Sequence, residues 1–253
     1  MTYQMLSNYL PKQAEAQEIA LQLQQWLPLT PNAQFNDQYL PDLKYKWSLN
    51  MESLSESFSA ISTLWKKGQG KTLGLLLCES KQGEPHILLA FSGQLDGQWS
   101  RSGWAPPLFN PISFAHESFE TQLQLYLLTH ILNTHAQNES ETTLKSTLKA
   151  QRKRKSSALT TKIHDAYHFT HPSGQTLRLS ELWPNAPTGT GECCAPKLLN
   201  WANERALKPL GLVEFWWGTP KGSNKAGESK DPCTTRCIPL LPFMLGLCPA
   251  QPI

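Results

Sequence analysis

Apolar residues recur at three- and four-residue intervals in three stretches of the first half of the chain. The first stretch covers 11–27, the second is centred on Phe58, and the third covers 114–136. A further helical pattern resumes at Leu144 after a polar interruption near Asn138. Because this spacing places apolar side chains on one face of a helix, each stretch predicts a helix.

Period-two patterns and short apolar runs predict strands elsewhere. The nearly continuous apolar runs 73–79 and 86–92 flank a polar turn, which is typical of a β-hairpin covered on both faces. A second hairpin is predicted from 167–170 and 176–179, and a buried strand from 210–217. These runs predict that the chain contains a sheet as well as helices.

Two further helices and one loop complete the predicted order. We expect a helix from about Ala195 to Arg205 and a final helix that begins near Cys233. The proline-rich loop 93–111 carries aromatic residues, among them Trp104 and Phe109, which we expect to be exposed.

The order hairpin, helix, strand, helix is typical of a layered α/β protein. We therefore predict a mixed sheet with flanking helices, an order that a cytidine-deaminase-like fold would also have, and a long helical insertion. The predicted segments are a helical and irregular region at 1–70, a hairpin and aromatic loop at 71–113, a long basic helical segment at 114–166, and an α/β unit at 167–253. The last three, 71–253, are expected to form one domain.

Composition narrows the class of protein only a little. The chain has 253 residues, about two-fifths of them apolar, and a net charge of +3. No window approaches the roughly 20 apolar residues that span a bilayer, and residues 1–10 lack the pattern of a signal peptide. These observations predict a cytoplasmic protein without a membrane partner. In that compartment its six cysteines are expected to be reduced thiols or metal ligands.

Four of the cysteines fall in two clusters that suggest a metal site. Glu192 and Cys193 precede one predicted helix, and Cys233 and Cys237 follow about forty residues later. Three thiolates can hold zinc, and a carboxylate beside the metal can move protons for a bound water. Cys193, Cys233 and Cys237 are therefore candidate zinc ligands, and Glu192 is a candidate catalytic residue. The alternative is that these are reduced thiols packed at helix ends.

The same order occurs in zinc-dependent nucleobase deaminases, in which a ligand and a catalytic Glu precede one helix and a Pro-Cys-x-x-Cys pair follows. Two features of this chain differ from that pattern. Glu192 precedes Cys193 instead of following its ligand by two residues, and three residues separate Cys233 from Cys237. A deaminase is accordingly the alternative function.

A basic run in the long helical segment is a candidate RNA-binding surface. Clustered Lys and Arg side chains on a helix contact phosphate backbones and release counterions. The alternative is an ordinary solvated helix. The candidate phosphate-binding residues are Lys149, Arg152, Lys153, Arg154 and Lys155.

Several blocks resemble a region of long bacterial RluA-type pseudouridine synthases, where they lie in an N-terminal extension upstream of the catalytic domain. The central block is Gly-Thr-Gly-Glu-Cys-x-Ala-Pro-Lys-Leu-Leu at 189–199, followed by Glu-Phe-Trp-Trp-Gly at 214–218. The Cys-x-x-x-Cys-x-Pro-x-Leu pattern that begins at Cys233 matches the end of that region. Further matching blocks lie at 88–93, 103–109 and 152–157.

The catalytic motif of that family is absent from this chain. The family uses an Asp in an Arg-Leu-Asp context, whereas Arg178-Leu179 is followed by Ser180. The resemblance therefore implies a non-catalytic accessory region that binds RNA or positions a substrate. It implies rRNA or tRNA as the partner. The chain is then either a stand-alone or truncated copy of the N-terminal region, or its partner is a pseudouridine synthase catalytic domain on a separate chain. Whether the chain is an enzyme stays open at this point.

Overall fold

The computed structural model describes residues 8–28, 30, 45–134 and 142–249. The polar interruption predicted near Asn138, and most of the irregular segment predicted before the second helix, lie outside these ranges.

Five strands form one mixed sheet in the order β1-β3-β2-β6-β7. β1 is parallel to β3, and the other neighbouring strands are antiparallel. β2 and β3 are the predicted first hairpin, and β6 is the predicted buried strand. The bounds are β1 Lys46–Trp47, β2 Gly70–Glu79, β3 Pro85–Phe91, β6 Lys208–Gly218 and β7 Ser229–Lys230.

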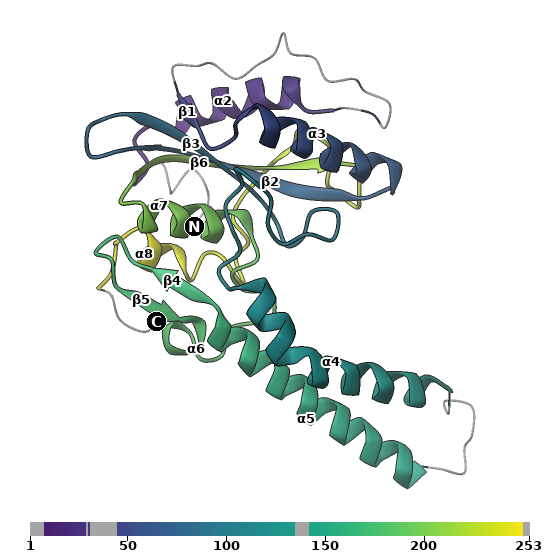
Figure 1. The fold of residues 1–253 in the computed structure, drawn as a ribbon. Helices are drawn as coiled ribbons and strands as arrows, with labels where there is room; N and C mark the ends of the chain where they lie inside the picture. The colour runs from purple at the N-terminus through teal and green to yellow at the C-terminus, as the bar shows by residue number, and fades with distance from the viewer. Residues whose placement is uncertain (1–7, 29, 31–44, 135–141, 250–253) are drawn as a thin grey trace.

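Helices cover both faces of this sheet (Figure 1). On one face lie α2 (Gln13–Trp26) and α3 (Met51–Lys66), and on the other lies α7 (Cys194–Glu204). Successive side chains of the central strands therefore point to opposite faces and belong to two separate hydrophobic cores. Leu75 and Leu77 pack with α2 and α3, whereas Leu76 packs with α7. The prediction of strands covered on both faces is confirmed, and so is a mixed sheet with flanking helices.

A second, smaller layer lies beyond α7. It contains the two-stranded sheet of β4 (His168–Thr170) and β5 (Thr176–Arg178), with the short helices α6 (Leu179–Leu182) and α8 (Leu241–Met244). α7 is thus enclosed between the large sheet and this layer, and most of its residues are buried. The start of α7 is consequently a place where several remote segments meet.

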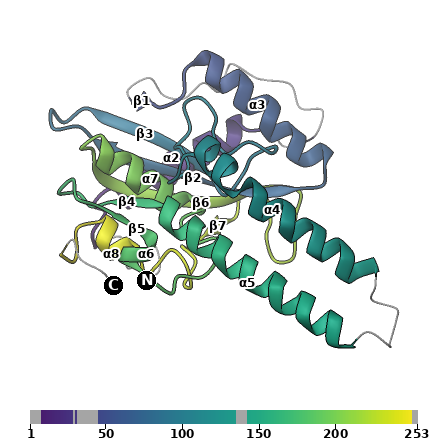
Figure 2. The same ribbon diagram turned by 60° about the horizontal axis from the view of Figure 1, so that its bottom comes forward.

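The helical insertion is an antiparallel hairpin that projects from the body of the molecule (Figures 1 and 2). It consists of α4 (Pro111–Thr134) and α5 (Thr142–Ala166). Asn110 caps α4, because its Oδ1 accepts hydrogen bonds from the backbone N–H groups of Ile112 and Ser113 at 3.0 and 3.1 Å. The base of the hairpin packs against the smaller layer and its far end extends beyond it.

Two predictions about local structure are wrong. Trp104 and Phe109 are buried, at 4% and 8% exposure, because the loop folds back over the sheet and Trp104 donates a hydrogen bond to Ser57 Oγ at 2.6 Å. The final helix does not begin near Cys233; the chain makes turns there and α8 begins only at Leu241. Prolines in this segment remove backbone donors, which limits helix to short pieces.

One buried histidine makes stability depend on pH. His164 on α5 is 6% exposed, and its Nε2 has no hydrogen-bond partner among the described residues. Burial lowers the pKa of His164 below its usual 6.5, although Asp165 opposes this. His164 therefore takes up a proton near pH 6.5 in the unfolded chain, but only at a lower pH in the folded chain. The free energy of unfolding consequently decreases as the pH falls below about 6.5.

We accordingly expect the free energy of unfolding to fall between pH 7 and pH 5, by less than about 1.4 kcal/mol per pH unit from this residue. Urea denaturation at several pH values would measure the slope. His164→Leu should flatten it, because an aliphatic side chain cannot take up the proton. His86, whose pKa burial also lowers, is present in both proteins, so its contribution cancels in the comparison. Equal slopes in both proteins would contradict the prediction.

Candidate metal centre and basic hairpin

Three of the predicted metal ligands come together in the folded chain. The Sγ atoms of Cys193, Cys233 and Cys237 all lie within 4.8 Å of one another, and those of Cys233 and Cys237 are 3.4 Å apart. Zinc held tetrahedrally by thiolates has Zn–S distances of about 2.3 Å, which places the sulfurs roughly 3.8 Å apart. The group can therefore bind a metal ion with only small side-chain movements. Three thiol ligands leave a fourth position open in a tetrahedral site.

Each ligand has a different structural support. Cys193 is the N-cap residue of α7. Its approach to the helix passes through Gly191, which has a φ of 91° and whose Cβ, if present, would lie 2.7 Å from Tyr167 Cδ1. Cys233 and Cys237 belong to a single turn, in which the Cys237 N–H donates to the Cys233 carbonyl at 3.1 Å and also approaches Cys233 Sγ at 3.4 Å. Four-residue spacing brings the two thiols together here through a turn instead of a regular helix.

The three thiols share hydrogen bonds, so that one of them is the preferred site of negative charge. Hydrogen bonds from Cys193 and Cys237 lower the pKa of Cys233, and the backbone N–H of Cys237 contributes. The hydrogen bond to Cys233 raises the pKa of Cys193, although the one to Cys237 opposes it, and hydrogen bonds to Cys193 and Cys233 raise the pKa of Cys237. Burial raises the pKa of both thiols further. A thiolate on Cys233 is therefore stabilised by its neighbours, and a thiolate is the form of cysteine that binds metals.

Glu192, the candidate catalytic residue, does not belong to this group of three. Its Oε1 accepts a hydrogen bond from the Tyr167 hydroxyl at 3.4 Å, and its main-chain carbonyl accepts one from Gly93 N–H at 2.8 Å. Burial lowers the pKa of Lys71, and the Glu192 carboxylate partly opposes that effect. The carboxylate thus interacts with Tyr167 and Lys71, which the sequence did not indicate as its neighbours.

Two buried charged residues near the start of α7 were missed from the sequence. Glu214 on β6 is 3% exposed, and its Oε1 accepts a hydrogen bond from the Ala195 N–H at 2.8 Å. Lys197 is 1% exposed, and its Nζ donates to the carbonyls of Phe91 and Gly93, both at 3.0 Å. Burial lowers the pKa of Lys197 to about 8. Glu214 is the single carboxylate in the otherwise apolar run 210–217, and this position in the sequence could have indicated a buried charged residue.

The remaining three cysteines lie outside the group. Cys78 is fully buried in an apolar strand, and burial raises its pKa to about 12. Cys194 is also buried, and its Sγ donates to the Thr72 carbonyl at 3.2 Å. Cys248 is partly exposed. These three thiols provide matched controls for substitutions at the candidate ligands.

The predicted phosphate-binding residues all lie on α5, but their side chains have different surroundings. Lys149, Lys153 and Arg154 are exposed. Arg152 is exposed as well, but its Nε donates to Thr129 Oγ1 on α4 at 2.9 Å. Lys155 is partly buried and donates to Gln124 Oε1 on α4 at 2.5 Å.

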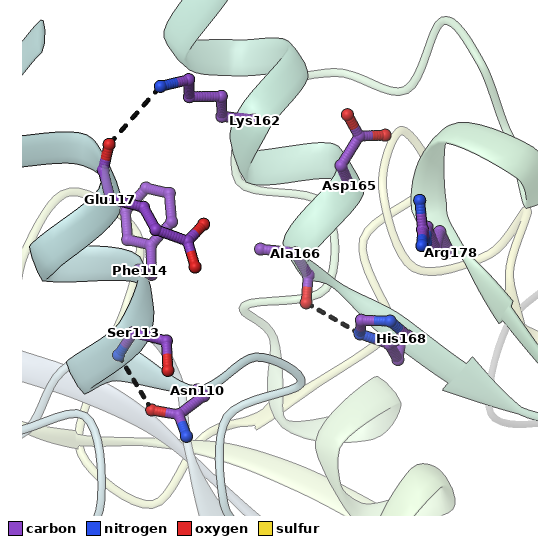
Figure 3. Close-up of a pocket in the computed structure, with 9 residues that line it drawn as sticks. All are labelled: Asn110, Ser113, Phe114, Glu117, Lys162, Asp165, Ala166, His168 and Arg178. Atoms are coloured by element: carbon purple, nitrogen blue, oxygen red, sulfur yellow. Dashed lines mark hydrogen bonds between the residues drawn. The ribbon is translucent and has the colours of Figure 1, made fainter.

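A cavity of about 520 Å³ lies at the base of the hairpin, between α4, the end of α5 and the β4–β5 sheet (Figure 3). None of the three clustered cysteines lines it. Cations line it at Lys162 and Arg178 and carboxylates at Glu117 and Asp165, so its charge is mixed. Lys162 Nζ donates to the Glu117 carbonyl at 3.4 Å. The cavity therefore lies where the hairpin meets the body of the molecule.

No helix in the described ranges has the length and apolar character needed to cross a bilayer. Comparison of the chain with protein-family models, with curated proteins and with solved structures finds no match in any of the three.

Proposed function

We propose that this chain is a non-catalytic accessory protein that binds RNA through the α4–α5 hairpin, related to the N-terminal extension of RluA-type pseudouridine synthases. The observation that supports it is the placement of the basic run on a helix that projects from the body. α5 carries seven Lys or Arg residues and one Asp. The resemblance in sequence supplies the RNA context, and in that context the partners are rRNA or tRNA and a pseudouridine synthase catalytic domain.

The exposed cations of α5 are the residues that we assign to phosphate contacts. Lys149 and Lys153 are four residues apart, so they lie on the same side of the helix, and Arg154 lies on an adjoining side. Arg152 and Lys155 instead hold α5 against α4 through Thr129 and Gln124. We therefore assign direct phosphate contacts to the three exposed residues, and positioning of α5 against α4 to Arg152 and Lys155.

We further propose that the metal of the three-cysteine group is zinc and that its role is structural. Thiolate-rich, tetrahedral sites select zinc among the common divalent ions. The ion would join the start of α7 to the turn that contains Cys233 and Cys237, two segments about forty residues apart in the chain. It would thereby hold the segment that leads into α8 against the start of α7, and no step of chemistry is assigned to it.

Reversing the exposed charges should weaken RNA binding strongly. For Lys149→Glu, Lys153→Glu and Arg154→Glu together, we expect the affinity for a labelled stem-loop RNA to fall at least about tenfold at low salt. The slope of log K against log salt should fall by about two to three, because three phosphate contacts are lost. Fluorescence anisotropy over a range of salt concentrations measures both quantities.

A matched control separates this effect from a change in net charge. Lys66, Lys81 and Lys221 are exposed and lie on the body of the molecule. Replacing these three with Glu gives the same total charge but leaves α5 intact, and RNA affinity should change far less. If both triple variants lose affinity equally, or if the unaltered protein does not bind RNA, the assignment of the hairpin to RNA binding is wrong.

A zinc-dependent nucleobase deaminase is the second candidate, favoured by the convergence of Cys193, Cys233 and Cys237 at the start of a helix that packs on the sheet. Three ligands and an open fourth position are what a zinc-bound water requires. The position of Glu192 beside Tyr167 counts against it, because a proton shuttle must reach the metal-bound water. Release of ammonia from cytidine or adenosine by zinc-loaded protein would establish the deaminase and remove the non-catalytic proposal.

A further inference from the structure

α4 exposes several large apolar side chains along one side of the projecting hairpin. Most of the exposed large apolar side chains in the described residues belong to this one helix. We define the α4 apolar face as Ile112, Phe119, Leu123, Tyr126 and Leu127, which are 83%, 67%, 45%, 69% and 48% exposed. Patches of this kind on soluble proteins mark interaction sites.

The α4 apolar face is directed away from α5. Gln124 and Thr129 accept hydrogen bonds from α5, so they flank the side of α4 that packs against its partner helix. With 100° between successive helical residues, Leu123 and Phe119 lie on roughly the opposite side of α4. The packing within one hairpin therefore leaves this face uncovered.

The lack of charged residues in the second half of α4 indicates which kind of partner this helix could bind. Residues 121–134 contain no Asp, Glu, Lys or Arg. Leu123, Tyr126 and Leu127 lie in this uncharged stretch, whereas Glu117 and Glu120 precede it nearer the base of the hairpin. The uncharged stretch offers nothing to an acidic or basic partner, but it can pair with an identical surface without repulsion. We propose that the α4 apolar face is a homodimer interface, in which the hairpins of two copies of this chain pack together through α4 as a layer of four helices.

The area of this face suffices for such an interface. Side chains of this size have surfaces of roughly 150–250 Å², and about half or more of each is exposed here. Each chain would then bury on the order of 500 Å², and the pair on the order of 1,000 Å², which is the lower limit for a specific interface. Equivalent faces related by a twofold axis satisfy the symmetry that soluble dimers prefer.

The arrangement also keeps the basic helices apart. In a layer with the two copies of α4 at its centre, each α5 lies at an outer edge. Packed helices are about 8–10 Å apart, so the two copies of α5 would be separated by on the order of 25 Å. This exceeds the Debye length of about 8 Å at physiological salt, so that repulsion between the basic helices is screened. Lys149, Lys153 and Arg154 stay exposed, and the proposal does not depend on RNA binding.

Sedimentation equilibrium of the full chain tests the proposal. We expect a dimer with a dissociation constant in the micromolar range, as befits an interface near the lower size limit. The double variant Leu123→Glu, Tyr126→Glu should raise that constant at least about 30-fold, because it places charge at the centre of the interface. Leu21→Glu on α2 is the matched control: Leu21 is 59% exposed, far from α4, and this variant should dimerise as the unaltered chain does.

Circular dichroism and thermal unfolding establish that the double variant is folded, which we expect because both positions are exposed. A cross-link between two chains from a photoreactive amino acid at Leu127, lost in the presence of the double substitution, would add direct support. A chain that is monomeric up to about 100 μM would overturn the proposal, since a dimer in the micromolar range would then be detected. So would a dimer that the double substitution leaves unchanged.

Discussion

Cys237→Ser is expected to abolish metal binding and to lower the free energy of unfolding by about 3–5 kcal/mol. Protein purified without chelator should contain one equivalent of zinc, and the variant should contain none. The effect is large because Cys237 is fully buried and its Sγ lies within 4.8 Å of two other thiols. With one thiolate removed, only two ligands remain. The metal ion then no longer links the start of α7 to the turn that contains Cys233. Metal analysis and urea denaturation measure the two effects.

Cys248→Ser is the matched control, because Cys248 is a partly exposed thiol outside the group. It should retain the full metal content and the stability of the unaltered chain. Chelator added to the unaltered protein should lower its stability toward that of Cys237→Ser and should have little effect on that variant. Well-folded protein without any metal, whose stability does not respond to chelator, would show that the three residues are reduced thiols packed together.

Glu214→Ala should lower the free energy of unfolding by about 2–4 kcal/mol and should weaken zinc binding as well. The Glu214 carboxylate reaches from β6 to the Ala195 N–H at the start of α7, only two residues after Cys193. Its removal leaves a buried N–H without that acceptor and a space beneath the helix. Both effects disturb the position of Cys193, so stability and metal affinity should fall together. Denaturation and a competitive zinc titration provide the two readouts.

Two companion variants separate charge from hydrogen bonding. Glu214→Gln keeps an oxygen that can accept from Ala195 N–H, and it should therefore lose less stability than the alanine variant. Glu228→Ala removes a carboxylate that is 45% exposed and paired with Lys230, and it should change the stability little, because solvent screens a surface ion pair. If Glu214→Ala proves as mild as the surface substitution, the carboxylate does not hold the helix in place.

The local pattern of the chain was sufficient for most helices and strands. The apolar runs of β2 and β3 predicted a hairpin covered on both faces, and α2, α3 and α4 were found where helical spacing indicated them. The hairpin β4–β5 and the strand β6 were also predicted. These elements depend on short-range periodicity, which is present in the sequence itself.

Local pattern failed where contacts between remote segments outweigh it. Trp104 lies in a proline-rich loop of polar appearance, but it is buried because the indole packs against Phe91 of the sheet and bonds to Ser57 of α3. The segment after Cys233 has apolar residues at helical spacing, yet only Leu241–Met244 is helical, because prolines interrupt the backbone hydrogen bonding. The spacing of apolar residues does not indicate that the loop folds over the sheet, and it does not indicate that the last helix is short.

The candidate site shows the same division. Sequence alone identified Cys193, Cys233 and Cys237 as possible ligands, because thiols in clusters are chemically suited to metals. Only the tertiary structure brings their sulfurs within 4.8 Å of one another, by placing the turn of Cys233 and Cys237 against the start of α7. It also places Glu192 beside Tyr167 and directs Glu214 from β6 to the helix instead. Residue type determines which chemistry is available, whereas distance and burial, which depend on the packing of segments far apart in the chain, decide which groups can act together.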